Sequence, residues 1–384
     1  MQKNLLRSWP RTASLVLLCF LCLCPRAEAQ IWPVRYINSL INDTSDVARS
    51  QFLLYPTVAF APETSWEFGF SSLYVYYARE DTTNRLSEVN GFTFVTLERQ
   101  WGIWFDHALY THENKWFILG RLRFQNFPLR YFGIGMDSPP QYQALVDAQQ
   151  ILIKERVLRK LGKNIFFGPE FDFQRFSSVQ FIPGPAVDIL DTPLGSEGSS
   201  NLAAGIGLLY DSRHNVLNVR EAFFWELATL HYLPVLSDFS FTSLISDTRI
   251  YRSISRNTVI AGQVLGHFNF GEVPFNQLSL MGGESLMRGY YLGRFRDRHQ
   301  VASQAEIRFL PLPLGFSKRI GAAAFAGVAT VFDDFGRAEA RDLVWSAGGG
   351  LRFLLFPKKD IYTRFDVAFT AEGTGYYLFI GEAF

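Results

Sequence analysis

Apolar and polar residues alternate at every second position in segments that recur through most of the chain. In residues 66–76 large aromatic side chains share one face, opposite Glu67, and in residues 361–370 a second apolar face lies opposite Arg364 and Asp366. A period of two residues predicts β-strands with one apolar face. That face would point at the core of a soluble β-sandwich or at the lipid around a membrane β-barrel, where Arg364 and Asp366 would face a polar lumen.

The alternation predicts sixteen strands. An even number is expected of a barrel whose two chain ends lie on the same side of the membrane. The predicted strands begin near Phe52, Ser65, Val89, Gly102, Lys115, Val146, Asn164, Leu202, Val219, Ser237, Asn257, Val301, Arg319, Val344, Asp360 and Tyr376.

Connection lengths favour the membrane barrel over the sandwich. The long connections follow odd-numbered strands, at about residues 126–142, 177–201 and 271–300, whereas those after even-numbered strands are mostly tight, as at 162–163 and 357–359. Residues 79–88 form the one even connection that is longer than expected. Long loops on the outside and short periplasmic turns are typical of outer-membrane proteins. Because lipid offers no partner to backbone N–H and C=O groups, such a sheet must close on itself. We therefore predict a 16-stranded antiparallel transmembrane β-barrel.

The final segment alternates up to an aromatic last residue. Tyr376, Leu378, Ile380 and Phe384 share one face, which Glu382 interrupts. We expect these four apolar residues to form a C-terminal signal for insertion into the outer membrane. A soluble protein that ends in an edge strand is the alternative interpretation.

The first residues are typical of a secretory leader. Lys3, Arg7 and Arg11 precede an apolar stretch at 13–24, and Ala27-Glu28-Ala29 matches a cleavage site. A spanning helix needs about 20 apolar residues, so this stretch is too short to be one. The predicted organisation is a signal peptide at 1–29, a short periplasmic segment at 30–50 and the barrel at 51–384.

Composition narrows the class of protein further. All three cysteines (Cys19, Cys22 and Cys24) lie in the leader, so the mature chain has neither a disulfide nor a thiolate metal site. Removing residues 1–29 takes away four positive charges and the charge of Glu28, which changes the net charge from +1 to −2. That balance argues against a nucleic-acid partner. No later apolar run reaches 18 residues, which excludes helical membrane spans.

The connection after the eleventh strand carries the most specific motif. It reads Gly282-Gly283, then Arg288-Gly289-Tyr290. On the twelfth strand Gln304, Glu306 and Arg308 share one face, opposite Ser303, Ala305, Ile307 and Phe309. If the second set meets lipid, Glu306 faces inward and can pair bidentately with the guanidinium of Arg288.

This motif resembles the Gly-Gly…Arg-Gly-(Phe/Tyr) loop of the BamA/TamA outer-membrane assembly superfamily, the bacterial surface antigen barrels. Residues 210–215, 349–352 and 364–366 are similar to other patterns of that family, and the likeness spans about 202–384. The resemblance implies that the loop folds back into the lumen between strands eleven and twelve. It also implies a latch in which polar side chains hold Arg288, with Gly282, Gly283, Gly289, Tyr290, Glu306 and Arg308 as the other latch residues.

Two departures from the family stand out. Gly327 takes the place of an aspartate that the family usually has on the thirteenth strand, and small residues there would let the loop pack close to the wall. Between Gln30 and the first strand there is no room for a periplasmic POTRA domain. The resemblance therefore implies a barrel-only member.

Residue patterns for catalysis or metal binding are absent from the sequence. The six histidines form neither an HExxH motif nor another tight metal pair, and there is no GxSxG motif or phosphate-binding glycine loop. Asp333 and Asp334 would suit a solvated turn better than a calcium site. We expect no catalytic residues, no cofactor and no metal.

The expected function is a noncatalytic one in the outer membrane of a Gram-negative bacterium, in contact with lipid and lipopolysaccharide. The resemblance implies help with insertion, assembly or translocation of outer-membrane or surface proteins, through a weak seam between the first and last strands. The barrel would act with protein clients or envelope-complex subunits, or as a homo-oligomer, and without nucleic acid. The alternatives are a passive pore or structural subunit of an envelope complex, and an outer-membrane lipase or acyltransferase, for which no Ser/His/acid set can be assembled.

Overall fold

The computed structural model describes residues 49–186, 192–213, 216, 218–336, 342–357 and 360–384. The predicted signal peptide at 1–29 and nearly all of the predicted periplasmic segment at 30–50 lie outside the described residues.

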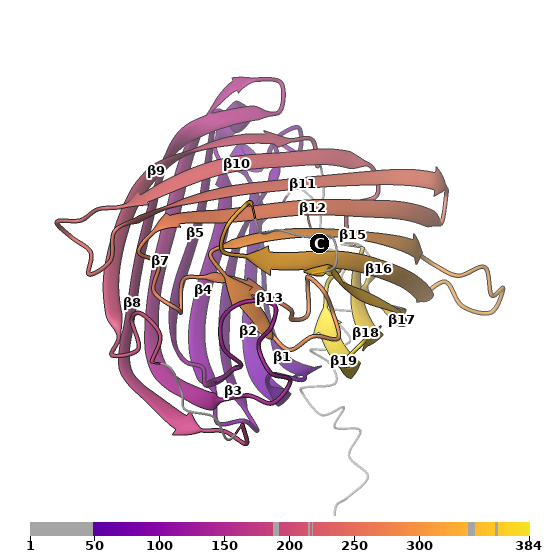
Figure 1. Ribbon diagram of the computed structural model, residues 1–384. Coiled ribbons are helices and arrows are strands. Elements are labelled where there is room, and N and C mark those ends of the chain that lie inside the picture. The colour runs from indigo at the N-terminus through magenta and orange to yellow at the C-terminus, as the bar shows by residue number, and fades with distance from the viewer. Residues whose placement is uncertain (1–48, 187–191, 214–215, 217, 337–341, 358–359) are drawn as a thin grey trace, which may run out of the picture. The chain divides into compact units, whose positions relative to one another are not determined.

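The described chain forms one closed, antiparallel β-barrel of sixteen strands, each hydrogen-bonded to its neighbours in chain order (Figure 1). Each predicted strand is present and begins within four residues of its expected start. The strands are β1 (Gln51–Ala61), β2 (Ser65–Tyr77), β3 (Leu86–Thr96), β4 (Trp101–Tyr110), β5 (Trp116–Asn126), β7 (Ala144–Gly162), β8 (Ile165–Pro183), β9 (Ser199–Asp211), β10 (Ala222–Tyr232), β11 (Phe241–Ser255), β12 (Thr258–Gly271), β15 (His299–Phe309), β16 (Ile320–Phe332), β17 (Val344–Phe356), β18 (Ile361–Thr370) and β19 (Gly373–Ile380).

Three further short strands do not add to the sixteen. β6 (Leu129–Tyr131) continues β5 after Pro128, and both strands pair with β7. Proline has no N–H to donate, which accounts for the break. β13 (Ser279–Met281) and β14 (Phe295–Asp297) pair with each other in the connection between β12 and β15. The 3₁₀ turns η1 (Ala78–Glu80) and η2 (His112–Asn114) lie in two of the other connections. No helix among the described residues is long and apolar enough to cross a membrane.

The two faces of the strands differ as the alternation predicts. On β2 the side chains of Phe68 and Phe70 are 46% and 61% exposed, whereas Glu67 is 8% exposed. On β18 Phe365 is exposed, while Arg364 and Asp366 are buried. An outer face of exposed aromatics is what a wall in contact with lipid requires.

The longest connections follow β5, β8 and β12, as expected, but one boundary is wrong. The predicted connection at 177–201 begins only after Pro183, because β7 and β8 are 19 residues long. The β7–β8 ladder contains a bulge, marked by a register shift between Asp147 and Gln149 and by a positive φ of 56° at Ser178. The ladder continues beyond this bulge. Alternation alone does not show that a strand continues through a bulge.

Candidate functional site: the Arg288 loop and the strand seam

The loop between β12 and β15 reverses at glycines that require positive φ. Residues 282–294 join β13 to β14, and Gly282 and Gly289 have φ of 113° and 106°. Residues with a Cβ rarely adopt such values. A Cβ on Gly289 would also lie 2.5 Å from Cγ2 of Thr370. Glycine is therefore needed where this loop meets β18.

Arg288 is completely buried and bridges two carboxylates. Its Nη2 donates to Oε2 of Glu306 on β15 at 2.5 Å, and its Nη1 donates to Oδ2 of Asp366 on β18 at 2.7 Å. The structure thus brings Arg288 and Glu306 together, as the sequence predicts. The predicted bidentate geometry is wrong, because the two ends of the guanidinium bind carboxylates on different strands.

An aromatic ring and two backbone contacts complete the surroundings of Arg288. The ring centroid of Phe325 on β16 lies 3.4 Å from the guanidinium carbon, a cation–π contact. The carbonyl of Arg288 accepts a hydrogen bond from the Ser346 hydroxyl. The N–H of Gly289 donates to the Tyr377 hydroxyl oxygen at 2.8 Å. Strands β15 to β19 therefore each contribute a side chain that contacts Arg288 or Gly289.

Glu306 and Asp366 also belong to a larger buried network of charges. Arg308 donates to Glu306 at 2.9 Å, and Arg364 donates to Asp366 at 2.9 Å. Arg352 reaches both acids, at 3.3 Å from Glu306 and 2.5 Å from Asp366. Each acid is thus surrounded by arginines. Removing one of the acids would leave buried arginines without a counter-charge, which is strongly destabilising.

Small residues between the charged ones make room for this network. In the register, Ala323 and Gly350 lie in the row that runs from Arg308 to Asp366. Gly348 lies beside Phe325, and a Cβ on it would be 2.6 Å from that ring. The glycine run 348–350 is therefore part of β17, where it accommodates large side chains from neighbouring strands.

The barrel closes through a weak seam. β1 and β19 share one register pair, Phe60↔Leu378, whereas the β1–β2 ladder has eleven pairs between Gln51↔Val75 and Ala61↔Ser65. Ladder hydrogen bonds hold neighbouring strands together. The seam is therefore the place where this wall is held least tightly by its backbone.

A sequence profile described as the Omp85 superfamily domain matches residues 162–374. The chain belongs to the Omp85 superfamily. With its sixteen strands it is an Omp85 outer-membrane β-barrel.

The fold is similar to that of a solved BamA structure. BamA from Haemophilus ducreyi lacking POTRA domains 1–3 superposes with a TM-score of 0.58 at 12% identity, covering 87% of this chain and 70% of that chain. At this identity the likeness concerns the fold alone. OpdQ of Pseudomonas aeruginosa has a TM-score of 0.34 at 9% identity, covering 86% of this chain and 95% of that chain. A search of curated proteins gave no match.

Gly327 of this Omp85 barrel lies beneath the loop. A Cβ at this position would be 3.3 Å from Sδ of Met287 and 3.1 Å from Cβ of Gln304. Met287 thus occupies the space that a larger side chain on β16 would need. The carboxylate that shares Arg288 with Glu306 comes instead from Asp366 on β18, a residue that the sequence placed on the inner face but not beside Arg288.

The other predicted latch residues lie around this centre. Tyr290 is 2% exposed and packs edge-on against Phe295, with ring centroids 5.7 Å apart. Gly282 and Gly283 are buried and form part of the reversal. The sequence did not single out Ser346, Phe325 or Tyr377 as contacts of the loop. The one signal in the sequence is that these three residues occupy inward-facing positions in the alternation of their strands.

The end of the Omp85 barrel differs from the expectation of one alternating strand up to Phe384. β19 ends at Ile380, and Gly381 has a φ of 95°. Beyond Gly381, Oε2 of Glu382 accepts a hydrogen bond from Nε of Arg352 at 2.9 Å. The ring of Phe384 packs near that of Tyr251. Tyr376 remains on the outer face at 48% exposure, with Leu378 and Ile380 partly exposed. The polar interruption at Glu382 is thus a partner of the buried arginines.

Within the described part of the chain, no group of three or more His, Cys, Asp or Glu residues could hold a metal ion. His107 pairs with Glu155 at 3.0 Å, and Asp333 pairs with Arg298 at 2.9 Å.

Proposed function

We propose that this Omp85 barrel acts without catalysing a reaction and helps insert, assemble or translocate outer-membrane or surface proteins. The observation that carries the proposal is the seam, where β1 and β19 share only the pair Phe60↔Leu378. Strand edges bind other extended chains through backbone hydrogen bonds. A seam that parts at low cost would let a client strand pair with the barrel wall.

We also infer that residues 272–298 fold back into the lumen. The inference is supported by the complete burial of Arg288 and by its partners Glu306 and Asp366, which alternate with outward-facing apolar residues. In this role the loop joins β15 to β19 from inside. These five strands would stay together while the seam opens.

This function implies both lipid and protein partners for the barrel. The outer wall would contact outer-membrane lipid and lipopolysaccharide, and the seam would contact protein clients. The barrel would work with subunits of an envelope complex or with a second copy of itself.

A disulfide across the seam tests the proposal. Beyond the leader the chain has no cysteine, so Phe60→Cys with Leu378→Cys introduces one defined pair. Directly opposed residues in an antiparallel ladder lie within disulfide range. The matched control is Phe60→Cys with Trp66→Cys, which links the same residue to its register partner on β2.

The readout is the profile of outer-membrane proteins in a deletion strain that expresses each variant. We expect the seam-locked barrel to restore the profile only after a reductant is added, and the control to restore it in both conditions. A normal profile in the deletion strain, or full activity of the locked barrel, would contradict an assembly role.

A further inference from the structure

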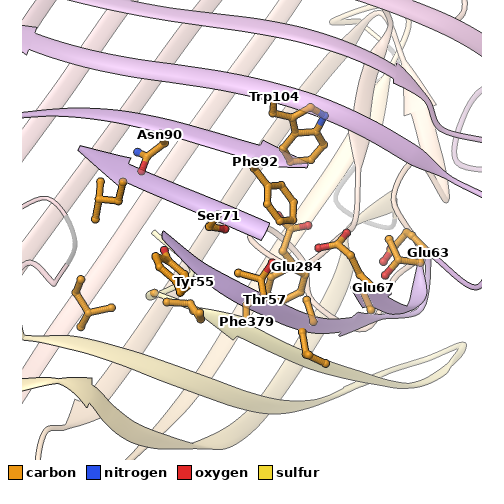
Figure 2. A pocket seen from close by; sticks show the side chains of 18 of the residues that line it. Tyr55, Thr57, Glu63, Glu67, Ser71, Asn90, Phe92, Trp104, Glu284 and Phe379 are labelled. Carbon is orange, nitrogen blue, oxygen red and sulfur yellow. The ribbon is translucent and has the colours of Figure 1, made fainter. Parts of the chain in front are cut away.

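A cavity of about 380 Å³ lies along the seam, between β1, β2, β3 and β4, the end of β19 and the Arg288 loop (Figure 2). Its volume is within the range of pockets that hold small molecules. Its lining combines acidic groups with aromatic and aliphatic side chains and contains neither lysine nor arginine.

Three carboxyl groups gather at one end of this cavity. Glu63 from the β1–β2 turn, Glu67 from β2 and Glu284 from the loop are seen together in Figure 2. Glu67 is buried, with 8% of the residue exposed, and within the described residues its carboxylate has no hydrogen bond or ion pair and lines the cavity. Glu63 is 5% exposed, and its Oε1 accepts from the Leu292 N–H at 2.6 Å.

The lining of the cavity supplies no positive charge to these three carboxyl groups. A buried carboxylate without a cation or several donors carries a large desolvation penalty. Burial raises the pKa of Glu63 to about 7, and the nearby charge of Glu284 adds to this rise. Elsewhere in the barrel buried acids such as Glu306 and Asp366 are each paired with arginines. No lysine or arginine lines this cavity, and the one positive side chain that acts on Glu63, Arg130, lies outside the lining.

The rest of the cavity is mostly apolar, with Thr57, Ser71 and Asn90 among its polar side chains, and it reaches the outer face of the barrel. Phe92, Trp104 and Phe379 also line the cavity, and aromatic faces attract organic cations. Val58 and Ile380 also line it, although both alternate toward the outside, and Val58 is 46% exposed. These two residues lie two positions from Phe60 and Leu378, the one register pair of the seam. The cavity therefore connects an enclosed acidic end to the lipid side of the wall.

We propose that this cavity binds an amphiphile with a protonated amine head and an apolar body, which enters from the membrane through the seam. The ammonium group would lie among Glu63, Glu67 and Glu284, and the apolar body would extend past Phe379 toward Val58. A divalent metal ion does not fit, because these carboxyl groups do not form a metal-binding group. An anionic headgroup would be repelled. This binding needs only the folded barrel and goes beyond any assembly role.

The test uses the full barrel reconstituted in phosphatidylcholine vesicles with two fluorescent probes. Dansylcadaverine carries a primary ammonium on an apolar dansyl body, and N-acetyl-dansylcadaverine has the same body without the charge. The variants are Glu67→Gln, Glu63→Gln and, as a control that removes a charge outside the cavity, Glu98→Gln in the exposed turn after β3. Resistance to denaturation in detergent without heating shows that each variant is folded.

We expect the cationic probe to bind the unaltered barrel at least ~10-fold more tightly than the acetylated probe. Glu67→Gln should abolish this preference, Glu63→Gln should weaken it and Glu98→Gln should leave it unchanged. Glu67→Gln removes an uncompensated buried charge, so it should not impair folding. If Glu67→Gln does not fold, the loss of probe preference in Glu63→Gln tests the proposal instead. Equal affinities of the two probes, absence of binding, or a preference that survives both cavity substitutions would overturn the proposal.

Discussion

The guanidinium of Arg288 and the carboxylate of Asp366 are 78 positions apart in the chain and 2.7 Å apart in the barrel. Asp366 lies on β18, three strands beyond β15, which carries Glu306. One loop arginine thus links strands that do not pair with each other. The contact combines a buried charge, a second carboxylate and the ring of Phe325. Its removal should therefore affect strands β15 to β19.

Arg288→Ala should destabilise the barrel by about 1.5–3 kcal/mol, because it removes charge-assisted hydrogen bonds to the buried carboxylates of Glu306 and Asp366. The loss of stability from Arg288→Lys should lie between zero and that from Arg288→Ala. One ammonium group keeps the charge but cannot hold two carboxylates in the planar geometry of a guanidinium. The measurement is urea unfolding from phospholipid vesicles. Arg298→Ala is the control, because its ion pair with Asp333 is half exposed and should contribute about 0–1 kcal/mol. Equal losses for Arg288→Ala and Arg298→Ala would show that the buried bridge does not stabilise the fold.

Gly327→Asp, which restores the residue usual in the family, should destabilise this barrel by about 1–3 kcal/mol. The new side chain would meet Met287 and Gln304, which already lie within 3.3 Å of the position of its Cβ. Adding Met287→Ala should recover part of the loss by opening space. The same unfolding assay checks both variants. An increase in stability from Gly327→Asp alone would mean that the loop can move aside to accept the carboxylate.

The free energy of unfolding of the barrel should fall as pH rises from about 4.5 to 7, because Glu63 loses its proton in this range. Burial raises the pKa of Glu63 to about 7 in the folded barrel, above its ordinary value, so the folded state binds this proton more tightly than the unfolded chain. The stabilisation is complete below the unfolded pKa and is lost as pH passes the folded pKa. A shift of this size corresponds to about 3 kcal/mol. Unfolding at pH 5 and pH 8 should show a smaller difference for Glu63→Gln than for Glu98→Gln. Identical slopes would argue that Glu63 is solvated.

Planar-bilayer recordings should show small, unsteady currents. The Arg288 loop carries a completely buried side chain held by β15 and β18, so it should not leave an open channel beside it. A passive pore, the alternative function, would give large and steady currents. Such currents from the purified barrel would favour the pore and weigh against a loop inside the lumen.

The sequence alone determined the number of strands, their order and which side chains face outward. Each of these follows from a period of two residues and from turn positions, which are local properties. The pairing of Arg288 with Glu306 was also predictable, because the motif and the inner face of the strand can both be read from the chain. The length of β8 was not, since a bulge interrupts the alternation without ending the ladder.

Which distant groups meet depends on the folding of the whole barrel. Asp366 shares Arg288 because small residues on β16 and β17 leave a path between strands, and Glu382 reaches Arg352 because the chain leaves the ladder at Gly381. The unpaired carboxylate of Glu67 becomes visible only when four strands and a loop enclose it. Closure brings residues from both ends of the chain side by side, and alternation along one strand contains no information about what lies across the barrel.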